Sequence, residues 1–217
     1  MRPIISFDLD GTLVKPGFGD AVWLDGLPRI YAKEKQVSIF KAKSFFKNAY
    51  DTIGSDKREW YDLSFWINKY NLTITPQDLL DQFETYIQIF DDVRSVVQDL
   101  SKDHTLIISS GAMQEFIQKE LEYTGLQDYF HHTFSSITDT KTVKKDPAFY
   151  TIIAQTLHSL PENIIHIGDS LDYDYHSARK AGFLAYFLDR NPTETKPFTL
   201  SSLEEFRTII RIHQSPY

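Results

Sequence analysis

The chain has 217 residues, of which 41% are hydrophobic and 24% are charged, and it contains no cysteine. That hydrophobic share can fill a sizeable core, so we expect a folded protein with one main domain. The lack of cysteine excludes disulfides, thiolate zinc sites and cysteine nucleophiles. A net charge of -7 argues against coating nucleic acid, and no apolar run approaches the roughly 20 residues of a membrane span. We therefore expect a cytoplasmic protein without nucleic-acid or membrane partners.

The first element is a short β-prone run, Ile4–Phe7, that opens into an acidic turn. Asp8 and Asp10 are two positions apart, so in an extended segment their carboxylates point the same way. Gly11 suits a tight exit from the strand. The run therefore predicts a buried strand that presents two carboxylates at its end.

Residues 15–88 show helical periodicity and no convincing strand. Apolar stripes recur at helical spacing, and Thr75-Pro76 is typical of a helix start, with Thr75 as the N-cap. The stretch is far longer than the 2–6 residues usual for a strand-to-helix connection, so we predict an inserted helical domain. The insertion contains all three tryptophans of the chain, Trp23, Trp60 and Trp66. We expect the aromatic side chains of the insertion mainly to form its own core.

From residue 89 onward, strands and helices alternate. This pattern predicts an α/β fold, a Rossmann-like parallel sheet with helices on both faces, made from residues 1–14 and 89–217. The expected strands are 105–109, 133–135 (weaker), 163–167 and 183–188, and the expected helices carry apolar stripes over 93–100, 113–121, 149–157 and 203–210.

Polar and charged residues collect where these predicted strands end. The crevice beyond the carboxyl ends of parallel strands is where α/β sheets bind ligands. Several carboxylates without a soft ligand favour a hard cation, Mg²⁺ above all. The residues concerned are Asp8, Asp10, Ser109, Ser110, Gly111, Lys144, Lys145, Asp169, Asp172 and Asp174.

Four motifs in chain order resemble those of the haloacid dehalogenase superfamily. They are Asp8-Leu9-Asp10-Gly11-Thr12, then Ser109, then Lys144, and last Gly168-Asp169-Ser170 with Asp174. The resemblance covers the core on both sides of the insertion, whose position and length are similar to the family's helical C1-type cap. It implies the phosphatase branch of that superfamily, with Mg²⁺ as cofactor.

The resemblance also implies a role for each matching residue. Asp8 is the expected nucleophile that forms an aspartyl-phosphate, and Asp10 the expected general acid and base. Ser109 and Lys144 are expected to contact the transferring phosphoryl group. The expected metal ligands are Asp8, Asp10 (through its carbonyl), Asp169 and Asp174, and the expected substrate-binding residues are Gly11, Thr12, Ser110 and Gly111.

Three points depart from the family pattern or compete within it. Ser110 stands where asparagine is frequent, and Asp172 competes with Asp174, although only Asp174 has the family's spacing. Lys145 stands where proline is usual, so either lysine of the pair could enter the site, and spacing favours Lys144.

One segment of the insertion is basic. A solvated helix face is the plain interpretation, and a lid that attracts an anionic substrate is the functional one. Its cations are Arg29, Lys33, Lys35, Lys41, Lys43 and Lys47, against Glu34 alone.

The favoured function is a phosphatase of a small phosphorylated metabolite, such as phosphoglycolate, a sugar phosphate or a nucleotide monophosphate. Asp10 disfavours a haloacid dehalogenase, which usually lacks that acid. A phosphomutase resembling the β-phosphoglucomutases would carry a histidine just after the first motif, yet all seven histidines lie outside residues 11–90. A phosphonate hydrolase and a non-enzymatic phosphate sensor stay open, as does the choice between monomer and homodimer.

Overall fold

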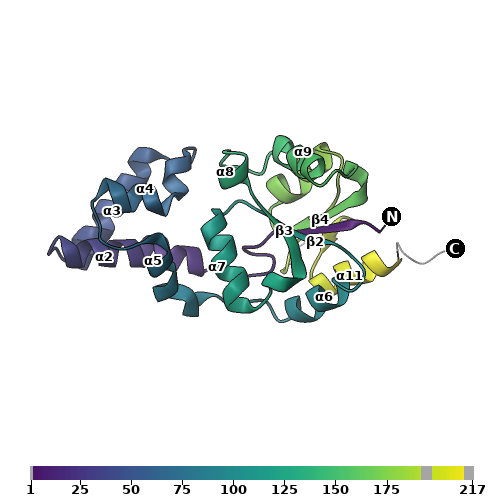
Figure 1. Cartoon of the computed structure of the whole chain (residues 1–217), viewed down its shortest axis with the longest axis horizontal. Coiled ribbons are helices and arrows are strands. Elements are labelled where there is room, and N and C mark those ends of the chain that lie inside the picture. The colour runs from purple at the N-terminus through teal and green to yellow at the C-terminus, as the bar shows by residue number, and fades with distance from the viewer. Residues whose placement is uncertain (1, 192–196, 213–217) are drawn as a thin grey trace.

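The computed structural model describes residues 2–191 and 197–212. Within these ranges no helix is long and apolar enough to cross a membrane. Figure 1 shows two parts, a sheet flanked by helices and a group of helices beside it that comes from the insertion.

The first part is a six-stranded parallel sheet with the order β3-β2-β1-β4-β5-β6. The chain steps outward from β1 to β3 and then returns to the other side of β1 with β4, which makes the β1–β4 boundary a topological switch point. The strands are β1 (Ile4–Phe7), β2 (Leu106–Ser110), β3 (Phe130–Ser135), β4 (Ile164–Gly168), β5 (Leu184–Leu188) and β6 (Thr199–Leu200).

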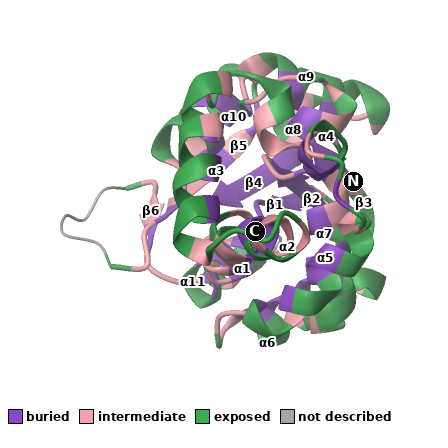
Figure 2. Cartoon of the chain, turned by 90° about the vertical axis from the view of Figure 1, so that its left-hand side faces the viewer, coloured by how far each residue is buried: buried purple, intermediate pink, exposed green. Residues whose placement is uncertain are grey.

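Helices cover both faces of this sheet, as the alternating pattern predicts. One apolar cluster holds Phe7 with side chains of α6, α7 and α11, and a second holds Ile107 with side chains of α9 and α10. In Figure 2 the strands between these layers are largely buried. The helices are α6 (Val93–Leu100), α7 (Gln114–Thr124), α8 (Ser136–Asp139), α9 (Pro147–Thr156), α10 (Ser177–Lys180) and α11 (Leu203–Ile212), with short turns η4 (Gln127–Tyr129), η5 (Pro161–Asn163) and η6 (Leu171–His176).

The second part lies between β1 and α6 in the sequence and is helical, as predicted. We call it the cap. Figure 1 shows its helices α2 to α5 together at one end of the molecule. They are α1 (Phe18–Ala21), α2 (Leu27–Glu34), α3 (Ile39–Ile53), α4 (Leu63–Lys69) and α5 (Pro76–Phe83), with the turns η1 (Val22–Gly26), η2 (Arg58–Tyr61) and η3 (Glu84–Tyr86).

Local sequence signals account for where several helices begin. Thr75 accepts a hydrogen bond from the backbone N–H of Asp78 at 3.1 Å, and Asp146 accepts one from that of Phe149 at 3.0 Å, so both are N-caps as predicted. Two strand predictions were incomplete. The weak strand at 133–135 begins earlier, at Phe130, and β6 was missed because a two-residue strand carries no periodicity.

The two chain crossings between core and cap lie side by side. Val14 forms an antiparallel bridge with Ile89, and the Lys15 N–H donates to the Gln88 carbonyl at 2.7 Å. The two segments that connect core and cap are therefore neighbours, and the exact division after residue 14 and before residue 89 stays a prediction.

Candidate active site

A cavity of about 410 Å³ lies between the carboxyl edge of the sheet and the cap. Its two walls differ in kind. We call the core wall the site floor and the four cap rings the aromatic roof. The site floor comprises Asp8, Asp10, Ser110, Gly111, Lys145, Asp169 and Asp174, and the aromatic roof comprises Trp23, Tyr50, Trp60 and Tyr61.

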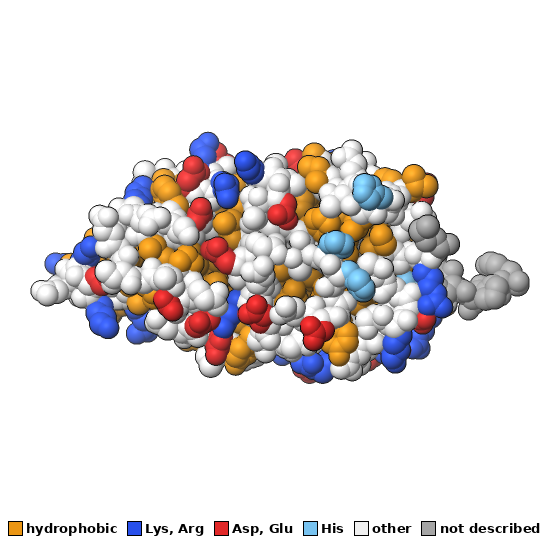
Figure 3. Space-filling view, in the orientation of Figure 1, with side chains coloured by type: hydrophobic (Ala, Val, Ile, Leu, Met, Phe, Trp, Pro, Cys, Tyr) orange, Lys and Arg blue, Asp and Glu red, His pale blue; other side chains and the backbone are white. Residues whose placement is uncertain are grey.

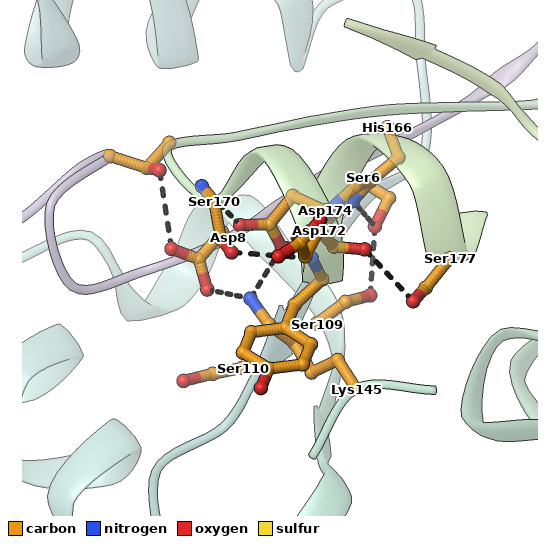
Figure 4. A network of polar contacts seen from close by, with 12 residues as sticks. Ser6, Asp8, Ser109, Ser110, Lys145, His166, Ser170, Asp172, Asp174 and Ser177 are labelled. Carbon is orange, nitrogen blue, oxygen red and sulfur yellow. Dashed lines mark hydrogen bonds and ion pairs between the residues drawn. The ribbon is translucent and has the colours of Figure 1, made fainter. Parts of the chain in front are cut away.

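Asp8 follows β1 directly and is 4% exposed. Its backbone N–H donates to the Ile167 carbonyl at 2.9 Å, which fixes the residue between β1 and β4. Its carboxylate accepts hydrogen bonds from Lys145 at 2.5 Å and from the Thr12 hydroxyl at 3.2 Å (Figure 4). Burial raises the pKa of Asp8, and the Lys145 ammonium acts in the opposite direction. The ionised form of Asp8 therefore depends on a neighbouring cation.

The lysine in the site is Lys145, so the preference for Lys144 was wrong about position. Lys145 Nζ lies 2.5 Å from both Asp8 Oδ1 and Asp174 Oδ1, and its side chain is 8% exposed. Lys144 is exposed, with its Nζ 5.7 Å from the centre of the Tyr173 ring. Adjacent residues in an irregular segment point in different directions, and the chain turns here because the Asp146 N–H donates to the Lys144 carbonyl. Spacing alone cannot tell which of two neighbouring lysines points inward.

Three carboxylates of the site floor converge. Oxygen atoms of Asp8, Asp169 and Asp174 lie within 4.8 Å of one another, so the cluster could hold a metal ion, whereas Asp172 is exposed. Lys145 offsets part of the charge. Burial alone would raise the pKa of Asp174, but Lys145 and His166 outweigh it and hold that pKa well below its ordinary value.

Two glycines make room for these carboxylates. A Cβ at Gly168 would lie 2.3 Å from Asp174 Cγ, and one at Gly11 would lie 2.0 Å from Asp169 Oδ2. Gly11 also has a φ of +80°, a conformation that other residues rarely adopt. Gly11 thus leaves room for Asp169, Thr12 donates a hydrogen bond to Asp8, and the substrate-binding roles that the resemblance suggested for both stay predictions.

Ser109 and Ser110 occupy different places. Ser109 is fully buried, with its Oγ 2.8 Å from Ser6 Oγ, and Ser6 Oγ lies 2.8 Å from His166 Nδ1. Ser110 and Gly111 line the cavity. The proposed phosphoryl contact of Ser109 stays a prediction, and in this structure Ser109 ends a buried hydrogen-bond network under the site floor.

That network also contains residues that the motifs did not identify. His166 is fully buried, and its Nε2 lies 3.1 Å from Asp174 Oδ1 and 3.2 Å from the Tyr150 hydroxyl. Burial lowers the pKa of His166 and so favours the neutral ring. The Ser170 N–H donates to Asp174 Oδ2 at 2.9 Å. Asp174 is therefore held from several sides, as a ligand carboxylate must be.

Asp10 lines the same cavity and, unlike Asp8, is exposed. Desolvation by the surrounding wall raises its pKa, the Asp20 charge adds to that rise, and a hydrogen bond with the Glu120 side chain opposes it. Glu120, on α7, is 1% exposed, and burial together with the charge of Asp10 raises its pKa well above the usual range. The sequence held one signal for Glu120, an acidic residue beside Phe116, Ile117 and Leu121 on the apolar helix face.

Comparison with known proteins agrees with this geometry. A family model for haloacid dehalogenase-like hydrolases matches residues 3–182. The chain belongs to that family. A comparison with curated proteins found no match.

Solved structures of haloacid dehalogenase-like hydrolases share the fold at low identity. An HAD phosphatase from Thermococcus onnurineus is 23% identical, with a TM-score of 0.77 over 97% of this chain and 98% of its own. A putative HAD-hydrolase from Bacillus subtilis, described as bound to magnesium, is 19% identical, with a TM-score of 0.66 over 97% and 100%. An L-2-haloacid dehalogenase from Xanthobacter autotrophicus is 16% identical, with a TM-score of 0.61 over 97% and 99%. These identities support a common fold and leave open which reaction this chain performs.

Proposed function

We propose that this chain is a Mg²⁺-dependent phosphatase that hydrolyses a small phosphomonoester through an aspartyl-phosphate. The observation that carries the proposal is the pair Asp8 and Asp10, which line one cavity in different settings. Asp8 is buried and contacts the Lys145 ammonium, whereas Asp10 is exposed and lies near the carboxyl groups of Glu120 and Asp20. Two carboxyl groups with different environments can divide nucleophilic and proton-transfer work between them.

In the proposed first step, a carboxylate oxygen of Asp8 forms a bond to phosphorus while the bond from phosphorus to the leaving oxygen breaks. Asp10, protonated, gives its proton to that leaving oxygen and becomes a carboxylate. In the second step, Asp10 takes a proton from water, whose oxygen attacks the phosphorus, and the Asp8 carboxylate is released. Both aspartates return to their starting states.

The remaining site-floor residues could balance or border the negative charge of the phosphoryl group. Lys145 would offset the negative charge of the phosphoryl group beside Asp8, and Ser110 with Gly111 would border it. Asp8, Asp169 and Asp174 would hold Mg²⁺, since they offer hard oxygen ligands, with the carbonyl of Asp10 as a further candidate. When bound, Mg²⁺ would supply positive charge that orients the phosphoryl group and lowers repulsion between it and Asp8.

Haloacid hydrolysis is the main competitor, because a haloacid dehalogenase shares the fold. A leaving halide needs no proton, so Asp10 would have no leaving group to protonate in that reaction. The leaving oxygen of a phosphate ester does need a proton, and Asp10 lines the cavity beside Asp8. This observation favours phosphoryl chemistry.

The test is hydrolysis of p-nitrophenyl phosphate with Mg²⁺ and with EDTA, using wild type, Asp8→Asn and Asp172→Asn. We expect Mg²⁺-dependent turnover that Asp8→Asn lowers at least about 10³-fold, because the nucleophile is lost. Asp172 is exposed and serves as the matched control, with activity near wild type. Turnover that survives Asp8→Asn would overturn the nucleophile, and a lack of turnover on every phosphate ester would favour a phosphate sensor.

A further inference from the structure

The aromatic roof is the part of the cavity that the proposed chemistry does not use. Trp23 and Trp60 lie with ring centres 6.3 Å apart, and Trp23 stacks on Phe116 of the core at 5.8 Å with an angle of 15° between the ring planes. Tyr50 lies edge-on to Trp23 at 6.2 Å. Whatever group leaves the phosphorus toward the cap therefore meets flat, apolar ring surfaces.

Two of the three cap tryptophans line the cavity. Trp66 does not: it is fully buried in the cap, as expected for most of the cap's aromatic side chains. Trp23 and Trp60 are half-buried and line the cavity instead. Aromatic side chains at a cavity wall bind planar groups by stacking and by excluding water.

Charge on the cap side of the cavity is negative. Asp20, exposed on α1, lines the cavity, and the described part of the cap contributes no cation to the lining. Two cations of the basic segment, Lys43 and Lys47, instead line a neighbouring cavity of about 430 Å³ that shares Trp23, Tyr50 and Trp60 with the first, and Lys43 and Arg29 are both paired to Asp25. Lys and Arg side chains lie along the outer edges of the cap in Figure 3. Within the described residues the basic segment therefore adds no charge to the lining of the cavity over the site floor, and Asp20 is the one charged side chain that the cap places there.

We infer that the substrate is a phosphate monoester whose leaving group is a flat, aromatic alcohol without negative charge. The inference rests on the proposed phosphatase function and narrows it. A cavity of about 410 Å³ has room for a phosphoryl group and a small ring system. Phosphoglycolate, named above as a candidate, becomes a poor substrate, because its carboxylate would lie near Asp20 without a cation.

The test compares esters of primary alcohols, whose leaving groups differ in shape and charge. We would measure kcat/KM for 2-naphthylmethyl phosphate, cyclohexylmethyl phosphate and phosphoglycolate with Mg²⁺. We expect the naphthyl ester to exceed the cyclohexyl ester about tenfold and phosphoglycolate about a hundredfold. Equal values for the naphthyl and cyclohexyl esters, or a higher value for phosphoglycolate, would overturn the inference.

Variants then assign the preference to residues. Trp60→Leu keeps an apolar side chain but removes a ring, so the ratio of naphthyl to cyclohexyl ester should fall toward one. Phe40→Leu is the matched control, since Phe40 is an 83% exposed cap residue outside the cavity lining, and the ratio should not change. Asp20→Asn should raise kcat/KM for phosphoglycolate about threefold or more while leaving that ratio unchanged. If Trp60→Leu leaves this kcat/KM ratio as in wild type, the aromatic roof does not determine specificity for the leaving group.

A second measurement separates this inference from the proposed function. Binding of 2-naphthylmethylphosphonate and of carboxymethylphosphonate, which are not hydrolysed, would be followed by tryptophan fluorescence and calorimetry. If the naphthyl compound binds more tightly than carboxymethylphosphonate but no ester is hydrolysed, the phosphatase proposal is overturned and the preference for a flat aromatic group is retained. Turnover of phosphoglycolate, together with tighter binding of carboxymethylphosphonate than of the naphthyl compound, would keep the phosphatase proposal and overturn the ligand class.

Discussion

The site floor is held by ion pairs, with Lys145 2.5 Å from two carboxylates, whereas the aromatic roof consists of packed rings whose centres lie 4.7 to 6.3 Å apart. Most floor residues follow strand ends, where hydrogen bonds between strands fix the backbone, and Lys145 comes from the segment before α9. The roof residues come from α3 and from the turns η1 and η2 of a separate helical part. The difference suggests a division of work, with bond-making on the rigid sheet edge and selection of the substrate on the cap.

The largest effect should come from breaking the charge balance of the site floor. Lys145→Met leaves Asp8 and Asp174 buried without their cation, so we expect kcat for a phosphate ester to fall about 10²- to 10³-fold. Lys144→Met is the matched control because Lys144 is exposed, and its kcat should stay within about twofold of wild type. Steady-state kinetics at saturating Mg²⁺ decides between the two lysines. A larger loss of kcat for Lys144→Met than for Lys145→Met would show that Lys144, which the spacing favoured, is the lysine that acts in the site.

A smaller effect should follow from adding one methyl group, in separate variants, to the core side and to the cap side of the cavity. Gly168→Ala places a Cβ against Asp174, so we expect Mg²⁺ to bind about 10- to 100-fold more weakly. Mg²⁺ titration of activity and calorimetry would measure this. Gly19→Ala, on α1 of the cap, adds the same group where nothing lies within 4 Å, and we expect little change. Equal effects of the two substitutions would remove the contrast between a rigid floor and a tolerant cap.

The smallest effect concerns the contact between the two parts. Lys119 on α7 of the core pairs with Asp81 at 2.7 Å and with Glu84, both in the cap. Its partners are partly exposed, so Lys119→Met should lower the free energy of unfolding by only about 0.5–1 kcal/mol, and less at high salt. Urea denaturation at low and high ionic strength would show this. A salt-independent loss of several kcal/mol would mean that the pair, rather than apolar packing, holds the cap to the core.

Much of the site floor could be predicted from the sequence because its residues follow strand ends. Asp8, Asp10, Asp169 and Asp174 were expected there from short local patterns, and they do line one cavity. Parallel strands bring their carboxyl ends to one edge whatever the details of the helices. The sheet with helices on both faces was predictable for the same reason, since each element carries its own periodicity.

The residues that were missed depend on packing between distant elements. Periodicity shows that Trp23, Trp60 and Trp66 are apolar positions, but not which of them faces the core of the cap and which faces the cavity. Glu120 meets Asp10 only because α7 packs where the chain leaves β1. In each case the missing information is the orientation of two elements far apart in sequence, which no local pattern contains.

The pairing of Val14 with Ile89 has a consequence for the folding and engineering of the core. Because the two ends of the insertion are neighbours, ordering the cap imposes almost no loop-closure cost on the sheet. A short turn from residue 14 to residue 89 could replace the cap without moving β1 relative to α6. Such a shortened chain should still assemble the sheet and bring its acidic strand ends together, and it would leave them open to solvent.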